Sequence, residues 1–320
     1  MSTFRFGATC FAIVVSASAA HVATAQDYPS RPIRIVTAAP GGGSDFTSRQ
    51  IAQGISGPLG QPVIVDNRGP GFIAGEVLNK ALPDGHTLLV NGGSTWITPL
   101  LQKAPYDVVR DFLPLSLLTR EVNIAAVHPA VPVQSVRELV DLAKSRPGNL
   151  NYSLSGVGGP QHLGAELFKS MAGVNIVGVP YKGTVPAVTA AVSGEVQLTI
   201  ADAGLVGPLA KSGKLKSLAV TSAEPSALAP GLPTVAASGI PGYEWVSLTG
   251  IWAPAKTSGA IISRLNQEIV RVLSRADVRE RFFNAGADTV GTSPENFAAI
   301  IKSEIAKMSK VIKDAGIRAD

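Results

Sequence analysis

The chain has 320 residues, of which 45% are hydrophobic and only 6% aromatic, and it carries 28 basic against 23 acidic residues. This modest, scattered positive charge and the shortage of aromatic side chains argue against a nucleic-acid partner and suit small anionic ligands. The length is sufficient for two ordinary domains, each with its own core.

The first 25 residues are typical of a secretory signal peptide. Arg5 precedes an apolar run, and Ala23 and Ala25 form a small-x-small cleavage site before Gln26. The apolar run is shorter than the roughly 20 residues that span a membrane, and no later segment reaches that length. The single cysteine, Cys10, lies in this segment, so no disulfide is expected. We therefore expect an exported, periplasmic protein, cleaved near Ala25 and Gln26.

From residue 32 to about residue 102, short apolar runs alternate with helix-like segments, which is the pattern of parallel α/β structure. Strands are expected at 33–37, 62–65 and 87–90, followed by helical segments at 45–57, at 73–81 and near 97. The apolar stretches 113–118 and 122–127 then predict two strands that lead out of this part of the chain.

A second α/β series follows. Its expected helices are 136–145, 161–171, 185–192 and 203–211, and its expected strands are 150–154, 176–179, 196–200 and 215–220. After a proline-rich segment, a strand at 243–252 returns to the first part, and the remainder is predicted to be helical at 260–273, 276–285 and 294–312. Two crossings imply a hinge between one domain of residues 26–124 plus 245–320 and another of residues 125–244.

The glycine tract that follows the first strand is the chain's first candidate site. Gly42 and Gly43 let backbone N–H groups approach a ligand, and Ser44 or Asp45 can cap a helix whose positive end favours anions. Taken alone, the tract is equally compatible with an ordinary strand-to-helix turn.

A second glycine loop repeats this arrangement. Ser155, Gly156 and Gly158 follow a predicted strand and precede a predicted helix, so the two loops together could hold one anionic group between two helix starts. His162, in the first turn of that helix, could contact a carboxylate, although a histidine there is more often a packing or capping residue.

Other polar residues also follow predicted strands. Ser94 and Thr95 offer hydroxyl groups to a ligand but are equally suited to helix capping. Tyr181 and Asp202 occupy comparable positions in the second series, and Lys182 could balance an acidic ligand or simply be solvated.

Catalysis finds little support in the sequence. No G-x-S-x-G, H-E-x-x-H or P-loop motif occurs, and His86, His128 and His162 lie far apart after the signal segment. No enzyme activity, metal site or cofactor is therefore predicted, although an α/β hydrolase or transferase with a dispersed active site remains the alternative.

The chain resembles the Bug-type receptors, the TctC-like solute-binding proteins of tripartite tricarboxylate transport systems. The resemblance runs through nearly the whole chain after the signal segment. It is carried by residues 28–33 (YPSRPI), 40–45 (PGGGSD), 83–88 (PDGHTL), 156–158 (GVG) with His162 and Leu163, 179–183 (VPYKG), 218–222 (LAVTS), 232–235 (LPTV) and 252–254 (WAP).

This resemblance implies an α/β, two-lobed periplasmic binding protein fold of type II, with two domains joined by a double crossover hinge. It also implies a receptor that captures a small carboxylate, either a di- or tricarboxylate or an aromatic acid, and delivers it to membrane permease subunits. A ligand-sensing role beside a sensor kinase is the other possibility, and a monomer is expected. The implied ligand contacts are Gly42, Gly43, Ser44, Asp45, Ser155, Gly156, Gly158 and His162, with Ser94, Thr95, Tyr181 and Asp202 lining the variable end. Gly159 and Pro160 depart from the glycine and small hydroxyl residue frequent in the family, which leaves one donor fewer.

Overall fold

The computed structural model describes residues 28–69, 72–157 and 159–314. The predicted signal peptide and Gly158 lie outside these described residues. Within the described part of the chain, no helix combines the length and the apolar character that crossing a membrane requires.

The first lobe is built around three strands that pair in parallel, with β1 in the middle. Its first elements are β1 (Ile33–Thr37), α1 (Gly43–Leu59), β2 (Val63–Asn67), α2 (Ile73–Asn79), β3 (Thr87–Gly92), α3 (Ser94–Leu101) and α4 (Val108–Asp111). Ile33 and Ile35 of β1 are fully buried and belong to the same core cluster as Ile51 and Ile55 of α1. These two helix residues are four positions apart and therefore lie on one face of the helix.

A single strand, β4 (Phe112–Val127), runs from the first lobe into the second. Up to Val122 it pairs antiparallel with β9 (Val246–Pro254), and from Asn123 onward it pairs with β7 (Leu198–Asp202) and β8 (Lys216–Val220). The sequence predicted two separate strands here. One continuous strand forms instead, because Arg120 and Glu121 interrupt the apolar pattern without interrupting the backbone pairing.

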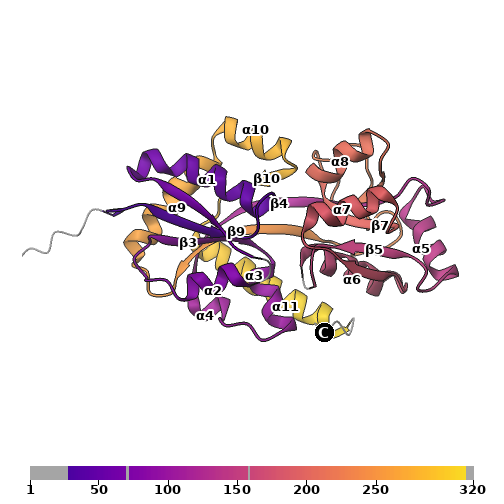
Figure 1. Cartoon of the computed structure of the whole chain (residues 1–320), viewed down its shortest axis with the longest axis horizontal. Helices are drawn as coiled ribbons and strands as arrows, with labels where there is room; N and C mark the ends of the chain where they lie inside the picture. The colour runs from indigo at the N-terminus through magenta and orange to yellow at the C-terminus, as the bar shows by residue number, and fades with distance from the viewer. Residues whose placement is uncertain (1–27, 70–71, 158, 315–320) are drawn as a thin grey trace, which may run out of the picture.

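The second lobe follows the predicted order closely. It contains α5 (Val136–Ser145), β5 (Asn151–Leu154), α6 (Pro160–Ala172), β6 (Val177–Pro180), α7 (Thr184–Ser193), β7, α8 (Ala203–Lys211) and β8. Strand β5 pairs in parallel with β6 and β7. Figure 1 shows α5 to α8 grouped at one end of the molecule, with β4 and β9 running between this group and the first lobe.

The chain returns through β9 and completes the first lobe. The last elements are α9 (Gly259–Leu273), α10 (Ala276–Asn284), β10 (Ala287–Thr289) and α11 (Pro294–Asp314). The strand order in the sheet is β2-β1-β3-β9-β4-β7-β5-β6, while β8 and β10 pair with β4 off this path. The three-residue strand β10 and the one-turn helix α4 were not predicted, since such short elements leave no periodic pattern.

Helix α11 is held against the sheet by aromatic packing. The ring of Phe297 contacts Trp252 of β9, with ring centroids 5.0 Å apart. A Cβ atom on Gly250 would lie only 2.0 Å from the Phe297 ring, so this strand position requires glycine. The long C-terminal helix therefore packs tightly over the strand that returns from the second lobe.

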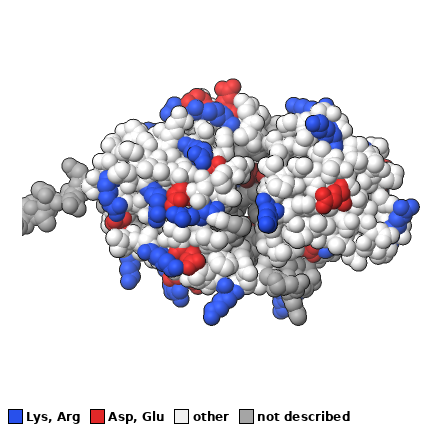
Figure 2. Space-filling model, viewed as in Figure 1, with Lys and Arg blue, Asp and Glu red and all other residues white. Residues whose placement is uncertain are grey.

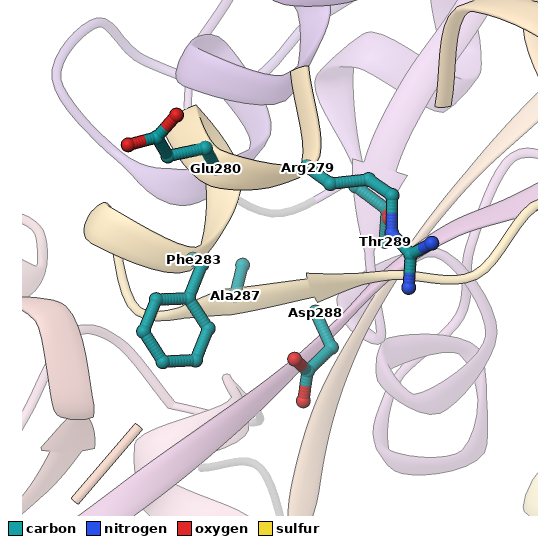
Figure 3. A pocket seen from close by; sticks show the side chains of 6 residues that line it. All are labelled: Arg279, Glu280, Phe283, Ala287, Asp288 and Thr289. Atoms are coloured by element: carbon teal, nitrogen blue, oxygen red, sulfur yellow. The ribbon is translucent and has the colours of Figure 1, made fainter. Parts of the chain in front are cut away.

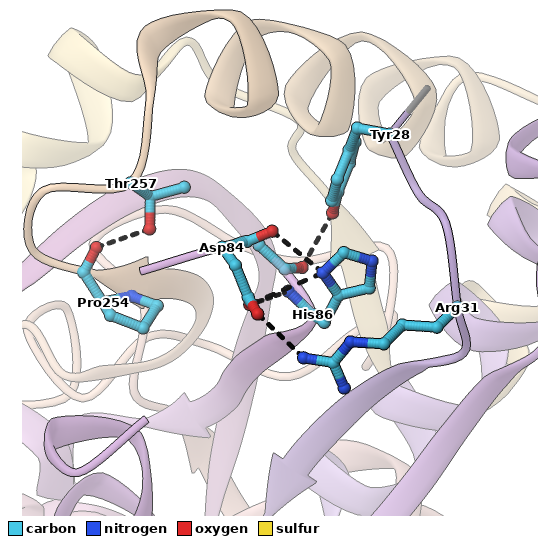
Figure 4. A network of polar contacts seen from close by, with 7 residues as sticks. Tyr28, Arg31, Asp84, His86, Pro254 and Thr257 are labelled. Carbon is cyan, nitrogen blue, oxygen red and sulfur yellow. Dashed lines mark hydrogen bonds and ion pairs between the residues drawn. The ribbon is translucent and has the colours of Figure 1, made fainter. Parts of the chain in front are cut away.

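Two segments quoted for the family resemblance meet at the edge of the first lobe (Figure 4). The Tyr28 hydroxyl donates to the Gly85 carbonyl at 2.7 Å, and Arg31 forms an ion pair with Asp84 at 2.8 Å. The Asp84 carboxylate also accepts the backbone N–H of His86 at 3.0 Å. These contacts attach residues 28–33 to the turn before β3, which gives both segments a structural role away from the carboxyl ends of the strands.

Candidate functional site

A cleft of about 730 Å³ lies where the two lobes meet. Its walls come from both lobes, and strands β4 and β9 contribute to its floor. The sequence-predicted residues that line it are Gly42, Gly43, Ser44, Asp45, Ser94, Ser155, Gly156 and Asp202. Residues from four separate chain segments thus converge on one space.

The first wall is the loop between β1 and α1. Gly41 has a φ of +84°, a conformation that favours glycine, and Gly42 is the N-cap of α1. No side chain caps this helix start, which corrects the expectation that Ser44 or Asp45 is the cap. Because the first N–H groups of an α-helix have no partner inside the helix, the start of α1 presents backbone donors to the cleft.

Asp45 lies in the first turn of α1, and its carboxylate stabilises the loop. One oxygen accepts the backbone N–H of Gly41 at 3.1 Å, and the other accepts the Asn67 amide at 2.8 Å. Arg49 forms an ion pair with it at 3.0 Å. Burial opposes ionisation, but the bonds from Asn67, Gly41 and Arg49 outweigh it and lower the pKa of Asp45. Both oxygens are therefore occupied by the protein itself.

The opposite wall is the loop between β5 and α6. Gly159 is the N-cap of α6, again without a side-chain cap, and Pro160 opens the helix. The Gly159 N–H donates to the Gly156 carbonyl at 3.2 Å, which closes a tight turn, and Gly156 has a φ of +141°. The structure thus places a second uncapped helix start across the cleft from the first. Gly158, predicted in this loop, lies outside the described residues.

Two acidic side chains line the space between these loops. Glu121 of β4 is only 8% exposed, and Asp202 ends β7. Burial, and then the nearby charge of Asp202, raise the pKa of Glu121 to about 7, and burial raises the pKa of Asp202 to about 6. Glu121 was not predicted as a site residue. The signal for it was a charged pair, Arg120 and Glu121, inside an otherwise apolar strand pattern.

Gln161, in the first turn of α6, is a second site residue that sequence reasoning missed. It lines the cleft and is 5% exposed, yet neither of its amide atoms has a hydrogen-bond partner among the described residues. A buried amide without partners is costly, so such a group normally has a ligand or a water molecule beside it.

Three predicted residues do not line the cleft. Thr95 is fully buried on α3, since one step along a helix from Ser94 turns its side chain towards the core. His162 is packed near Glu166, with 3.9 Å between Nε2 and Oε1, and burial lowers its pKa. The Tyr181 hydroxyl donates to Glu195 at 2.7 Å.

Other surfaces are poorer candidates. A hollow of about 250 Å³ between α10 and β10 is lined by charges of both signs, Arg279, Glu280 and Asp288 (Figure 3). Lys and Arg side chains are scattered over both lobes on the face shown in Figure 2. The described residues contain no group of acidic, histidine or cysteine side chains that could hold a metal ion.

Comparison with known proteins identifies the family. Residues 47–317 match the family described as "Tripartite tricarboxylate transporter family receptor" (TctC). The chain belongs to this receptor family. It is 32% identical to protein BugT of Bordetella pertussis over 324 residues, which covers 99% of this chain and 99% of BugT.

Two solved structures of similar proteins share the fold. R. palustris Rpa4515 with adipate is 35% identical and matches with a TM-score of 0.86, covering 91% of this chain and 99% of Rpa4515. MatC (Rpa3494) from Rhodopseudomonas palustris with bound malate is 29% identical, with a TM-score of 0.83, covering 89% of this chain and 100% of MatC. The predicted α/β periplasmic binding protein fold is confirmed, while the domain boundaries at 124/125 and 244/245 stay a prediction.

Proposed function

We propose that this TctC receptor captures a small carboxylate in the cleft between its lobes and delivers it to membrane permease subunits. The observation that carries this proposal is the pair of uncapped helix starts, at Gly42 and Gly159, on opposite walls of one cleft. Each helix start favours a negative charge through its free N–H groups and its dipole. The similar proteins Rpa4515, solved with adipate, and MatC, solved with bound malate, support a carboxylate as the ligand.

The cleft has a volume suited to a small organic acid. Its 730 Å³ falls within the range of about 300–1,000 Å³ common for small-molecule sites. Predicted ligand contacts are the backbone of Gly42, Gly43, Ser44, Ser155, Gly156 and Gly158. We assign Asp45 to stabilising the first loop, because its carboxylate already accepts bonds from Gly41 and Asn67.

Calorimetric titration of the purified protein with di- and tricarboxylates, amino acids and aromatic acids tests this proposal. We expect at least one acid to bind with a Kd in the micromolar range or below, about −8 kcal/mol. Binding of a sugar or an amine that lacks a carboxylate, with no binding of any acid, would overturn it. The acid should be recovered unchanged after incubation, since the proposed function is capture without covalent chemistry.

The remaining parts of the proposal concern place and partners. We propose that the protein is exported through the signal peptide at residues 1–25 and functions as a monomer in the periplasm. We also propose that it docks to transporter subunits. N-terminal sequencing of the exported protein should begin near Gln26. Co-purification should recover permease subunits, whereas recovery of a sensor kinase ectodomain in their place would favour the signalling role.

A further inference from the structure

The floor of the cleft carries two acidic side chains, Glu121 and Asp202, and a site that binds only anions does not account for them. Glu121 on β4 is paired with Ser247 on β9, and Asn123, two residues further along β4, is paired with Asp202 on β7. Residues two apart on a strand share a face, and directly paired residues across strands share it too. The register therefore puts the side chains of Glu121 and Asp202 on the same face, and both line the cleft.

The Glu121 carboxylate has one occupied oxygen and one open oxygen. Oε1 accepts the hydroxyls of Thr119 at 2.8 Å and Thr249 at 3.2 Å. Oε2 accepts no hydrogen bond from the described residues, and it lies 3.3 Å from the position that a Cβ atom on Gly43 would take. An acidic oxygen thus stands directly beside the first anion-binding loop.

The Asp202 side chain has no hydrogen-bond or ion-pair partner among the described residues. Asp202 is the N-cap of α8, but its side chain makes no capping hydrogen bond. Lys182, which lies just after β6, is the one basic side chain among the described residues that line the cleft. A ligand that carries only negative charge would therefore meet uncompensated repulsion at the floor, because like charges in a partly dehydrated site destabilise each other.

Gln161 gives an independent sign that the ligand has more than one kind of polar group. Its amide is buried at the wall of the cleft, and neither its donor nor its acceptor atom is used by the described part of the protein. A plain carboxylate can use the donor only. A ligand that also carries N–H groups can use both.

We infer that the ligand is an amino acid, whose carboxylate binds the two helix starts while its ammonium group binds the open oxygen of Glu121 and the carboxylate of Asp202. This inference rests on the proposed function and narrows its substrate class. Because the Glu121 carboxylate lies beside Gly43, the binding sites for the ammonium group and for the carboxylate are close together. This spacing fits an amino acid, in which both groups are attached to one α-carbon.

Matched pairs that differ only by the amino group provide the test. We would titrate the exported protein at pH 7.5 with aspartate and succinate, with glutamate and glutarate, and with alanine and propionate. The amino acid of the best-binding pair should bind at least about tenfold more tightly than its partner, about 1.4 kcal/mol. Equal or tighter binding of the deaminated acid would overturn the inference while leaving carboxylate capture intact. Failure of every acid and every amino acid to bind would overturn both.

Isosteric variants locate the effect. Glu121→Gln and Asp202→Asn should each lower the affinity for the amino acid by at least about tenfold. The affinity for its deaminated partner should stay the same or increase. Glu280→Gln, which makes the same charge change outside the cleft, should alter neither. An equal loss for both members of a pair would assign the two acids a structural role and contradict the inference.

The pH dependence of binding separates two roles for the acids. Lowering the pH from 7.5 to 5.5 protonates groups whose pKa values are about 7 and about 6, so amino acid binding should weaken. Because the same protonation removes the repulsion of a plain acid, the deaminated partner should bind equally well or more tightly at pH 5.5. Amino acid binding that is unchanged or tighter at pH 5.5 would overturn the inference.

Discussion

The two loops that face each other across the cleft are built differently. The first, between β1 and α1, is fixed by the Asp45 carboxylate, which contacts Gly41, Asn67 and Arg49. The second, between β5 and α6, is closed by a backbone bond from Gly159 to Gly156. The first loop is therefore preorganised by side chains, whereas the second depends on glycine conformations and on the position of its lobe. Preorganisation lowers the entropy that a ligand must offset on binding.

The largest effect should come from filling the space at the second loop. Ser155→Trp places an indole in the cleft, so the lobes cannot close around a ligand, and affinity should fall by at least about 100-fold, about 2.7 kcal/mol. Calorimetry measures this loss, and Ser145→Trp on the exposed end of α5 serves as the control. Wild-type affinity in Ser155→Trp would show that the second loop is not part of the site.

Releasing the first loop should have the next largest effect. Asp45→Ala removes the acceptor for Gly41 and Asn67, so the free energy of unfolding should fall by about 1–2 kcal/mol and ligand affinity by about tenfold. Ser155→Ala, in the loop that has no such network, should change stability by less than about 0.5 kcal/mol. Equal destabilisation by the two variants, measured by urea unfolding, would remove the contrast between the loops.

A close backbone contact between α8 of the second lobe and the turn before β10 of the first lobe should help to set the relative position of the lobes. A Cβ atom on Gly204, at the start of α8, would lie 2.0 Å from the Ala285 carbonyl oxygen in the turn before β10. Gly204→Ala should force the lobes apart and lower the affinity for the ligand by about threefold or more. Small-angle scattering should then show a larger radius of gyration. Gly207→Ala on the same helix meets no atom within 4 Å and should change neither value. Unchanged scattering in Gly204→Ala would mean that the contact does not set the lobe position.

The smallest effects concern pH and stability, and the two carboxylates should act with opposite signs. The lowered pKa of Asp45 contributes stability that is present at neutral pH and is lost as the pH falls through its folded-state value. The raised pKa of Glu121 means that stability is fully present below the ordinary carboxyl pKa of about 4.5 and is lost as the pH rises from there to about 7. Denaturant unfolding across pH 3 to 8 should therefore show a smaller acid loss in Asp45→Asn and a smaller loss between about pH 4.5 and 7 in Glu121→Gln. The same pH profile in wild type and both variants would contradict these assignments.

Sequence periodicity predicted much of the fold because most helices here have one apolar face. Helix α8 was predicted with its observed bounds, and α7 and α9 within one residue at each end. The continuous strand β4 was not predicted, since Arg120 and Glu121 look like a break when the cross-strand pairing is unknown. The strand β10 was missed because three residues contain too little pattern to detect.

The candidate site was only partly accessible to sequence reasoning. The glycine loops are local motifs, so both could be proposed directly from residues 40–45 and 155–159. Glu121 and Gln161 belong to no motif, and their importance depends on which elements the fold brings beside them. Thr95 was proposed together with Ser94 because the two are adjacent, but helix geometry points them to different faces.

A crystal structure of the protein with its tightest-binding acid tests the central claim most directly. The ligand carboxylate should accept hydrogen bonds, directly or through one water, from backbone N–H groups at the start of α1 and at the start of α6, at about 2.7–3.2 Å. A carboxylate bound by Lys182 alone, or in the hollow beside Arg279, would contradict the account.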